Sequence, residues 1–337
     1  MGKIVRPKIQ ELPRSIDRWT FCYLDQCYIH VDGGSIMAKR NDDRTLVIPS
    51  ASCMAIILGP GATVTHDAVK LLGGTGTAVI WMGADQTRFY ASGRPLSESA
   101  KLIEAQAKIV SNQRLRMACA KKMYGIRFPG IDAASRTTMN SLRGMEGNRM
   151  KTIYKDNEER TGVKWHGRYT ELDLIENIDT GSKTVNKAIT IGNQVLYAVC
   201  YAVCSAVGLS PALGVIHCKH QGSFIYDLSD LYKGKTTIPI GFDVAKELGD
   251  DYPDLDRISR ETRKRLRRKF KEIRLLKQMS QDIKYLFEDN DDEEKSSSIE
   301  SFLPDEIIWA DEETGLWDSN GVLPGGINYA LQQEIAS

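Results

Sequence analysis

The sequence predicts an α+β protein of more than one domain, with an N-terminal β-sandwich-like domain followed by a larger all-α domain. Short runs rich in aromatic and β-branched residues fill positions 19–93. Apolar residues then recur at helical spacing as far as residue 287, and 337 residues are enough for two domains of ordinary size. We expect a β-rich domain at 1–93, a linker at 94–99, a helical domain at 100–287 and an acidic tail at 288–337.

Seven runs in the first part are expected as strands, because clusters of Gly, Asp and Asn that favour turns separate them. One helix is expected among them, with Thr65 as its N-cap and Gly73 and Gly74 at its end. The expected strands are WTFCYL (19–24), CYIHVD (27–32), SIMAKR (35–40), TLVIPS (45–50), CMAIILG (53–59), TAVIWMG (77–83) and TRFYASG (87–93).

An uncharged segment of 22 residues runs from Val195 to Ile216 in the expected helical domain. Gly208 and Pro211 should end a helix there, which leaves roughly 15–18 apolar residues, fewer than the ~20 of a membrane span. We therefore expect a helix that is buried on all sides. The N-terminus has no apolar stretch typical of a signal peptide, so the sequence predicts a cytoplasmic protein with no membrane segment.

The charges are distributed unevenly along the chain, although the total is only +1. Residues 1–287 carry a net charge of +14, and residues 288–337 carry −13. A basic body with an acidic tail is typical of proteins with a polyanionic partner. The tail contains the Ser-rich acidic stretch EDNDDEEKSSSIES, and we expect it either to be disordered or to become ordered on a partner surface.

The densest group of chemically active residues is HCKH (217–220), followed by QGSFIYDLSDLYKG. Asp227 and Asp230 are three residues apart, so a helix places their carboxylates on one face. His217 ends the apolar segment, where an ionisable group needs a partner. A histidine with carboxylates fits a divalent cation that accepts a phosphate oxygen. The alternative is that Asp227 only caps a helix and the others are solvated.

A second metal hypothesis is a zinc site made of thiols and imidazoles. Cys200 and Cys204 are one helical turn apart, and Cys218, His217 and His220 follow. The two thiols belong to a wholly apolar helix, however, and buried thiols commonly pack as small hydrophobic side chains. The sequence therefore favours packing over zinc.

A carboxylate among arginines lies in SLRGMEGNRM (141–150), where Arg143 and Arg149 flank Glu146. This pattern is typical of a surface salt bridge, or of a metal ligand whose neighbouring arginines hold phosphates. Residues 257–277 add eleven bases against two acids, with Leu266 and Phe270 at helical spacing. We expect this basic helix, including Arg263, Arg267 and Arg268, to contact a phosphate backbone rather than a membrane surface.

Several of these motifs occur together in the order of a known family. They are RGMEGNRM (143–150), VKWHGRY (163–169), ALGVIH (212–217) and SFIYDLSDLYK (223–233), and the expected β domain adds ILGPGATVTHDAVKLLGGTGTAVIWMG and RFYASGRP. Over about residues 12–280 the chain resembles the CRISPR-associated endonuclease family "Cas-one", the integrase subunit of the spacer-acquisition complex, and looks like subtype I-E.

The resemblance implies one metal site, for Mg²⁺ or Mn²⁺, with Glu146, His217 and Asp230 as ligands and Asp227 as a supporting carboxylate. It implies an endonuclease and integrase that joins the 3′ ends of short double-stranded DNA into a CRISPR array. It also implies a homodimer that assembles with a small ferredoxin-like partner, "Cas-two". Joining a 3′-hydroxyl to a phosphodiester is in-line phosphoryl transfer, which one such ion can assist.

Other residues are weaker candidates for DNA contacts. Arg88 is a possible phosphate clamp, and Lys219 or His220 takes the basic role that the family places after its histidine. Tyr23 and Tyr28, expected on adjoining strands, could stack on bases, although ordinary strand packing is the favoured interpretation. Two other functions stay open at this point: a DNA-binding scaffold without catalysis, and a repair nuclease for branched DNA.

Overall fold

The computed structural model describes residues 20–40, 44–49, 53–83, 89–93, 100–130, 132–136, 138–168, 180–249 and 254–287. The expected linker at 94–99, the acidic tail at 288–337 and Arg88 lie outside these residues. The first part holds strands β1 (Cys22–Leu24), β2 (Cys27–Asp32), β3 (Ser35–Arg40), β4 (Thr45–Pro49), β5 (Ala55–Leu58), β6 (Thr63–Val64), β7 (Ala78–Met82) and β8 (Phe89–Gly93), with helix α1 (His66–Gly74) between β6 and β7.

Two four-stranded sheets form the β part, which confirms the β-sandwich-like prediction. One has the strand order β1-β5-β7-β8 and the other β4-β3-β2-β6. The β2–β3 hairpin turns at Gly33 and Gly34, whose φ angles of 54° and 77° favour glycine. Ile29 and Ile36 of one sheet share a buried cluster with Ile56 of the other, so the two sheets pack face to face.

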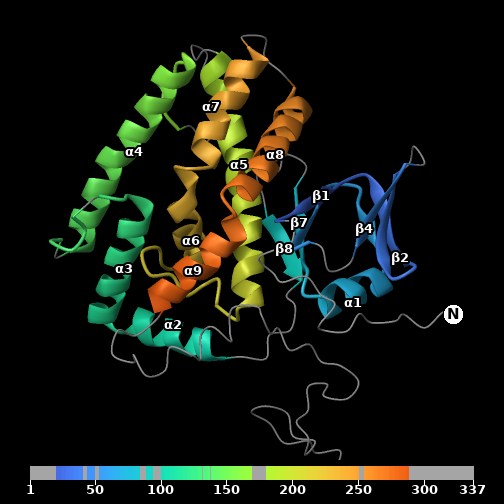
Figure 1. Ribbon diagram of the computed structural model, residues 1–337, viewed down its shortest axis with the longest axis horizontal. Coiled ribbons are helices and arrows are strands. Elements are labelled where there is room, and N and C mark those ends of the chain that lie inside the picture. The colour runs from blue at the N-terminus through green and yellow to red at the C-terminus, as the bar shows by residue number, and fades with distance from the viewer. Residues whose placement is uncertain are drawn as a thin grey trace, which may run out of the picture.

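The described residues after position 100 form a bundle of helices (Figure 1). As predicted, the β-rich part comes first and the helical part follows it. The described helices are α2 (Lys101–Ser111), α3 (Gln113–Arg127), α4 (Met139–Thr161), α5 (Thr180–Ala206), α6 (Ser223–Lys233), α7 (Thr237–Leu248), α8 (Leu255–Glu272) and α9 (Leu275–Phe287).

Helix α5 lies at the centre of the molecule, between the β1-β5-β7-β8 sheet and the other helices (Figure 1). Strand β5 is buried along its whole length, because one face packs on the second sheet and the other on the helices. On the opposite side α5 contacts α7 closely: a Cβ on Gly241 would lie 2.5 Å from Ile189 Cγ1, so the absence of a side chain at Gly241 permits this approach.

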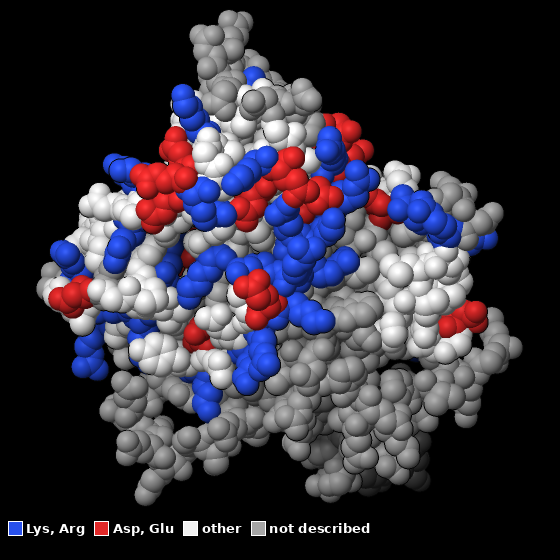
Figure 2. Space-filling model, turned by 45° about the horizontal axis from the view of Figure 1, so that its top comes forward, with Lys and Arg blue, Asp and Glu red and all other residues white. Residues whose placement is uncertain are grey.

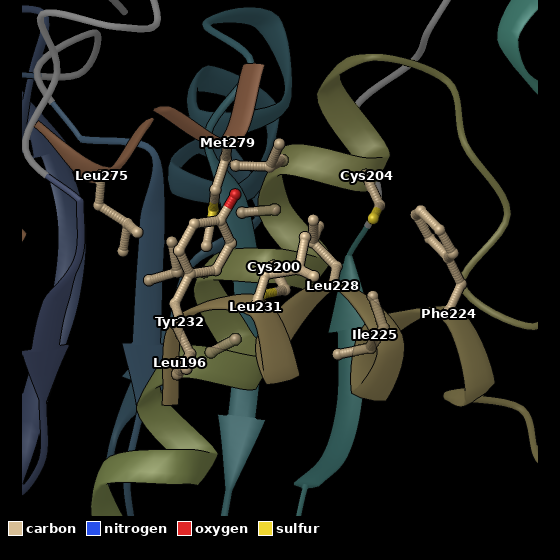
Figure 3. Close-up of a cluster of buried hydrophobic side chains, with 14 of the residues drawn as sticks. Leu196, Cys200, Cys204, Phe224, Ile225, Leu228, Leu231, Tyr232, Leu275 and Met279 are labelled. Carbon is tan, nitrogen blue, oxygen red and sulfur yellow. The ribbon is translucent and has the colours of Figure 1, made fainter. Parts of the chain in front are cut away.

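The apolar segment that ends at Ile216 behaves as expected. Helix α5 is long and apolar enough to cross a membrane by composition alone, yet most of the residues in that stretch are buried inside the protein. The helix stops at Ala206, and Gly208 follows with a φ of +79°. Cys200 and Cys204 pack among Leu196, Leu228 and their apolar neighbours (Figure 3). Burial raises the pKa of the Cys200 thiol well above its usual value, which favours packing over zinc binding.

Four local features differ from the sequence-based expectation. Tyr23 and Tyr28 do not lie on paired strands, because β1 pairs with β5 and β2 pairs with β3 and β6. The short strand β6 was not predicted. The helical pattern after residue 100 breaks at Asn112, whose side chain caps α3 by accepting from two backbone N–H groups. The basic helix also ends early, since Arg274 has a φ of +48° and separates α8 from α9.

Candidate metal centre and nucleic-acid interface

Asp227 lies in α6 and is almost wholly buried. Its Oδ2 accepts the backbone N–H groups of Val215 and Ile216 at 2.5 and 3.0 Å, and its Oδ1 accepts that of His217 at 2.9 Å. The alternative that Asp227 caps the N-terminus of a helix is therefore wrong, because its carboxylate accepts N–H groups of the loop before α6 and not those of α6 itself. These three hydrogen bonds fix the backbone that carries His217.

The imidazole of His217 is held by the same carboxylate. Its Nδ1 lies 2.7 Å from Asp227 Oδ1, and 46% of the side chain is exposed. The hydrogen bond to Asp227 raises the pKa of His217, and burial opposes it only in part. A carboxylate that holds Nδ1 is a common arrangement where the other ring nitrogen, Nε2, binds a metal in its deprotonated form.

Glu146 projects from the middle of α4 toward α3. Its Oε2 accepts from the Tyr124 hydroxyl at 2.8 Å, and its Oε1 pairs with Arg127 Nη1 at 2.6 Å. Burial and the hydrogen bond to Glu146 raise the pKa of Tyr124 well above its usual value, so Tyr124 donates as a neutral phenol. The partner of Glu146 is thus an arginine of α3 and not one of its neighbours in sequence.

Asp230 lies one turn after Asp227 and pairs with two cations. Its Oδ1 is 2.6 Å from Lys233 Nζ, and its Oδ2 is 3.4 Å from Arg127 Nη1. Lys233 also donates to the Tyr197 hydroxyl at 2.8 Å. Burial alone would lower the pKa of Lys233. The charge of Asp230 and the hydrogen bonds to Asp230 and Tyr197 together outweigh burial, so the pKa is raised. Lys233 is therefore a permanent cation beside Asp230.

Glu146 and Asp230 converge on the same atom, Nη1 of Arg127. Their nearest oxygens can be no further apart than the sum of the two distances to that atom, about 6 Å. Among the described residues, no three His, Cys, Asp or Glu side chains are grouped closely enough to hold an ion in this arrangement. Two carboxylates around a cationic group, with His217 and its buried partner, are nevertheless donors that suit Mg²⁺ or Mn²⁺.

The arginines predicted to hold phosphates on α4 are both exposed. Arg143 donates through Nη2 to the carbonyl of Ile216 at 3.2 Å, which ties α4 to the loop of His217. Lys219 and His220 are exposed in the next turn of that loop, where Lys219 has a φ of +66°. Arg143 and His217 therefore lie close together in space although 74 positions separate them in the sequence.

The basic helix α8 is divided between packing and exposure. Leu266 and Phe270 are buried as predicted. The guanidinium of Arg263 lies 3.9 Å from the ring centroid of Tyr23, and that of Arg267 lies 5.7 Å from that of Phe21. Both thus contact the aromatic side chains around β1 as cation–π partners. Arg268 is exposed.

Figure 2 shows Lys and Arg side chains gathered over the region where α8 lies, with acidic side chains between them. Three ion pairs join cations of α8 to carboxylates: Glu247 pairs with Arg265, Glu261 with Lys264 and Glu272 with Lys269. Three cations of the basic helix therefore have acidic partners.

Sequence reasoning missed four residues of the centre: Tyr124, Arg127, Tyr197 and Lys233. The only local signal for the first two was their i, i+3 spacing in KMYGIRF, which places both on one helical face. Lys233 ends the quoted SFIYDLSDLYK motif, three residues after Asp230. Their roles depend on how α3, α5 and α6 pack together.

A two-sheet β domain packed on helices, with a basic helix and clustered carboxylates near the chain's helical core, is typical of enzymes that act on nucleic acid. The family described as "CRISPR associated protein Cas1" matches residues 22–128 and 127–237 of this chain. The chain therefore belongs to the Cas1 family, which the sequence resemblance named "Cas-one".

Two relatives agree with this family. The CRISPR-associated endonuclease Cas1 of Clostridium sp. (strain SY8519) is 37% identical over 325 residues, which cover 96% of this chain and 100% of the relative. The protein of that name from Escherichia coli (strain K12) is 34% identical over 231 residues, or 68% and 74% of the two chains. Among solved structures, the TtCas1–DNA complex has a TM-score of 0.68 and 28% identity, and the match covers 91% of this chain and 99% of that one.

Proposed function

We propose that this protein is a metal-dependent DNA endonuclease and integrase that joins the 3′ ends of short duplex DNA into a CRISPR array, as in subtype I-E. The observation that carries the proposal is the convergence of Glu146 and Asp230, from two different helices, on one cationic atom. The relatives named above are CRISPR-associated endonucleases, and the TtCas1 structure is a complex with DNA.

Glu146, His217 and Asp230 are the residues that would hold one Mg²⁺ or Mn²⁺ ion. When bound, such an ion lowers the pKa of an attacking hydroxyl and neutralises a nonbridging phosphate oxygen. Asp227 supports the site indirectly, since its carboxylate fixes both the backbone and the ring of His217. Lys233 orients Asp230 through their ion pair, and the Tyr197 hydroxyl in turn holds Lys233.

The DNA would lie against exposed cations on both sides of this centre. Arg143 and Arg149 flank Glu146 on α4 and can each hold a phosphate through paired N–H groups. Arg268 and its exposed neighbours on α8 supply further contacts to the phosphate backbone. We extend the same role to Lys219, His220 and Arg88. Arg263 and Arg267 would first have to leave their aromatic partners.

The partners and the domain division belong to the same proposal. A homodimer and a small ferredoxin-like "Cas-two" partner complete an assembly that holds the duplex. The chain is divided into a β domain at 1–93, a linker at 94–99, a helical catalytic domain at 100–287 and an acidic tail at 288–337. The tail's net charge of −13 suits a basic partner surface or the basic body itself.

Glu146→Gln and His217→Ala test the function directly. Both variants should lower Mn²⁺-dependent joining of a duplex with free 3′-hydroxyls to a CRISPR repeat by at least about 100-fold, because the transition state loses electrostatic stabilisation. Binding of the same duplex, measured by fluorescence anisotropy, should stay within a few-fold of the starting protein. Glu159→Gln is the matched control, since Glu159 is an exposed carboxylate of α4 that pairs with Lys155.

Two results would contradict the proposal. Full joining activity in Glu146→Gln would show that the metal site is misassigned. The starting protein would be a scaffold without catalysis if it neither joined nor nicked DNA and if its salt-sensitive DNA binding were unchanged by a chelator. Cleavage of branched DNA without any preference for a CRISPR repeat would instead identify a repair nuclease.

A further inference from the structure

Arg127 is the group on which the two carboxylates of the proposed metal site converge. Its Nη1 lies 2.6 Å from Glu146 Oε1 and 3.4 Å from Asp230 Oδ2, and only 9% of its side chain is exposed. A cation in this position neutralises two carboxylates that would otherwise repel each other. Arg127 therefore provides, from within the chain, part of the charge that a divalent ion would bring.

This guanidinium and a divalent ion cannot share the position. An ion bound by both carboxylates lies about 2.0–2.5 Å from an oxygen of each. Arg127 Nη1 already lies 2.6 Å from one of those oxygens, so the two cations would be no more than about 5 Å apart. Their repulsion is strong where little water is present to screen it.

The remaining contacts of Arg127 would let its side chain move away. It is the last residue of α3, and the next residue, Phe128, has left helical geometry. Among the described residues, the hydrogen-bond partner of its Nη2 is the sulfur of Met150 at 3.5 Å, and its Cζ lies 5.0 Å from the Phe128 ring centroid. Glu146 keeps its bond to Tyr124 when Arg127 leaves, so one ligand stays oriented.

We infer that Arg127 is a positioning residue that holds Glu146 and Asp230 in place before the metal arrives and competes with the divalent ion for them. The inference rests on the proposed metal site and adds a regulator of its occupancy. It has two consequences. Removing the guanidinium strengthens metal binding, and it also destabilises the protein when no metal is present.

The test is an Mn²⁺ titration of the full chain, followed by the electron paramagnetic resonance signal of the free ion. Arg127→Gln keeps a hydrogen-bonding side chain but removes the charge, and its affinity for Mn²⁺ should rise roughly tenfold or more. Arg127→Lys should fall between this variant and the starting protein. Arg160→Gln is the matched control, because Arg160 pairs with Asp243 at 2.6 Å on another part of α4, and its affinity should not change.

A second readout does not depend on metal binding. In chelator, Arg127→Gln should melt at a lower temperature than the starting protein, and excess Mn²⁺ should remove most of that difference. Unchanged or weaker Mn²⁺ affinity in Arg127→Gln, in a protein where Glu146→Gln abolishes binding, would overturn this inference alone. If Glu146→Gln binds Mn²⁺ as well as the starting protein does, the proposed site fails and the competition fails with it.

Discussion

Asp227 and Asp230 lie one turn apart on α6, yet their surroundings differ in kind. Asp227 belongs to what we call the backbone-capping site, where it accepts three N–H groups from residues 215–217 and contacts the His217 ring. Asp230 belongs to the cation-bridged site, which it forms with Arg127, Glu146 and Lys233.

The difference lies in what balances each negative charge. Backbone dipoles are part of the fold and cannot leave, whereas the arginine of the cation-bridged site can be exchanged for another cation. We expect the backbone-capping site to matter for folding and the cation-bridged site for binding. Substitutions in each site test this distinction.

The largest effect should come from the backbone-capping site. Asp227→Ala leaves three N–H groups without their acceptor around a nearly fully buried position and frees the His217 ring. We expect the free energy of unfolding to fall by about 3–5 kcal/mol, measured by urea denaturation in chelator. An Asp227→Ala loss no larger than that of Asp230→Asn would remove the distinction between the two sites.

A smaller effect is expected from the cation-bridged site. Lys233→Met removes one of the two cations on Asp230 and the bond to Tyr197, but Arg127 remains. Because the methionine fills similar space, the free energy of unfolding should fall by only about 1–3 kcal/mol. Lys155→Met on exposed α4 is the control and should change it by less than about 0.5 kcal/mol. A loss in Lys233→Met as large as that in Asp227→Ala would show that the cation-bridged site is equally structural.

The smallest expected effect is a pH dependence of the free energy of unfolding, which comes from His217 in the backbone-capping site. The hydrogen bond to Asp227 raises the pKa of His217, so the charged ring stabilises the fold. This contribution is complete below the unfolded-state pKa of about 6.5 and is lost as pH rises through the higher folded-state pKa. Because nearly half of the ring is exposed, solvent screens the pair, and we expect no more than about 1 kcal/mol.

Urea unfolding of the starting protein and His217→Gln in chelator measures this contribution. The difference between them should be largest at about pH 5.5 and should shrink as the pH rises through the folded-state pKa of His217. His66→Gln, on α1, is the control for effects of a histidine substitution outside the Asp227 contact. A difference that grows toward high pH would mean that the neutral ring is the favoured form.

The residues that the sequence singled out for the centre have local signals. The motif around Glu146, the i, i+3 spacing of Asp227 and Asp230, and the position of His217 after an apolar run all fall within single segments. The strand runs from residues 27 to 40 were predicted at their observed bounds for the same reason.

What the sequence did not predict depends on packing between segments. Arg127 meets Glu146 and Asp230 only because α3 packs beside α4 and α6, which no spacing within one motif reveals. Tyr23 was expected on a strand next to that of Tyr28. Strand order depends on pairing between segments far apart in the sequence, and β1 pairs with β5 instead. Arg265 of α8 pairs with Glu247 of α7, which is another contact between elements.

The central position of α5 determines how the molecule comes apart. Ile57 and Ile80 of the first sheet share one apolar cluster with Leu196 and Val199 of α5, so the largest core cluster belongs to both parts of the molecule. A substitution in that shared cluster destabilises both parts together, so we expect the β part and the helical part to unfold cooperatively. The boundary that is visible along the chain near residue 93 is therefore not a boundary in the interior of the protein.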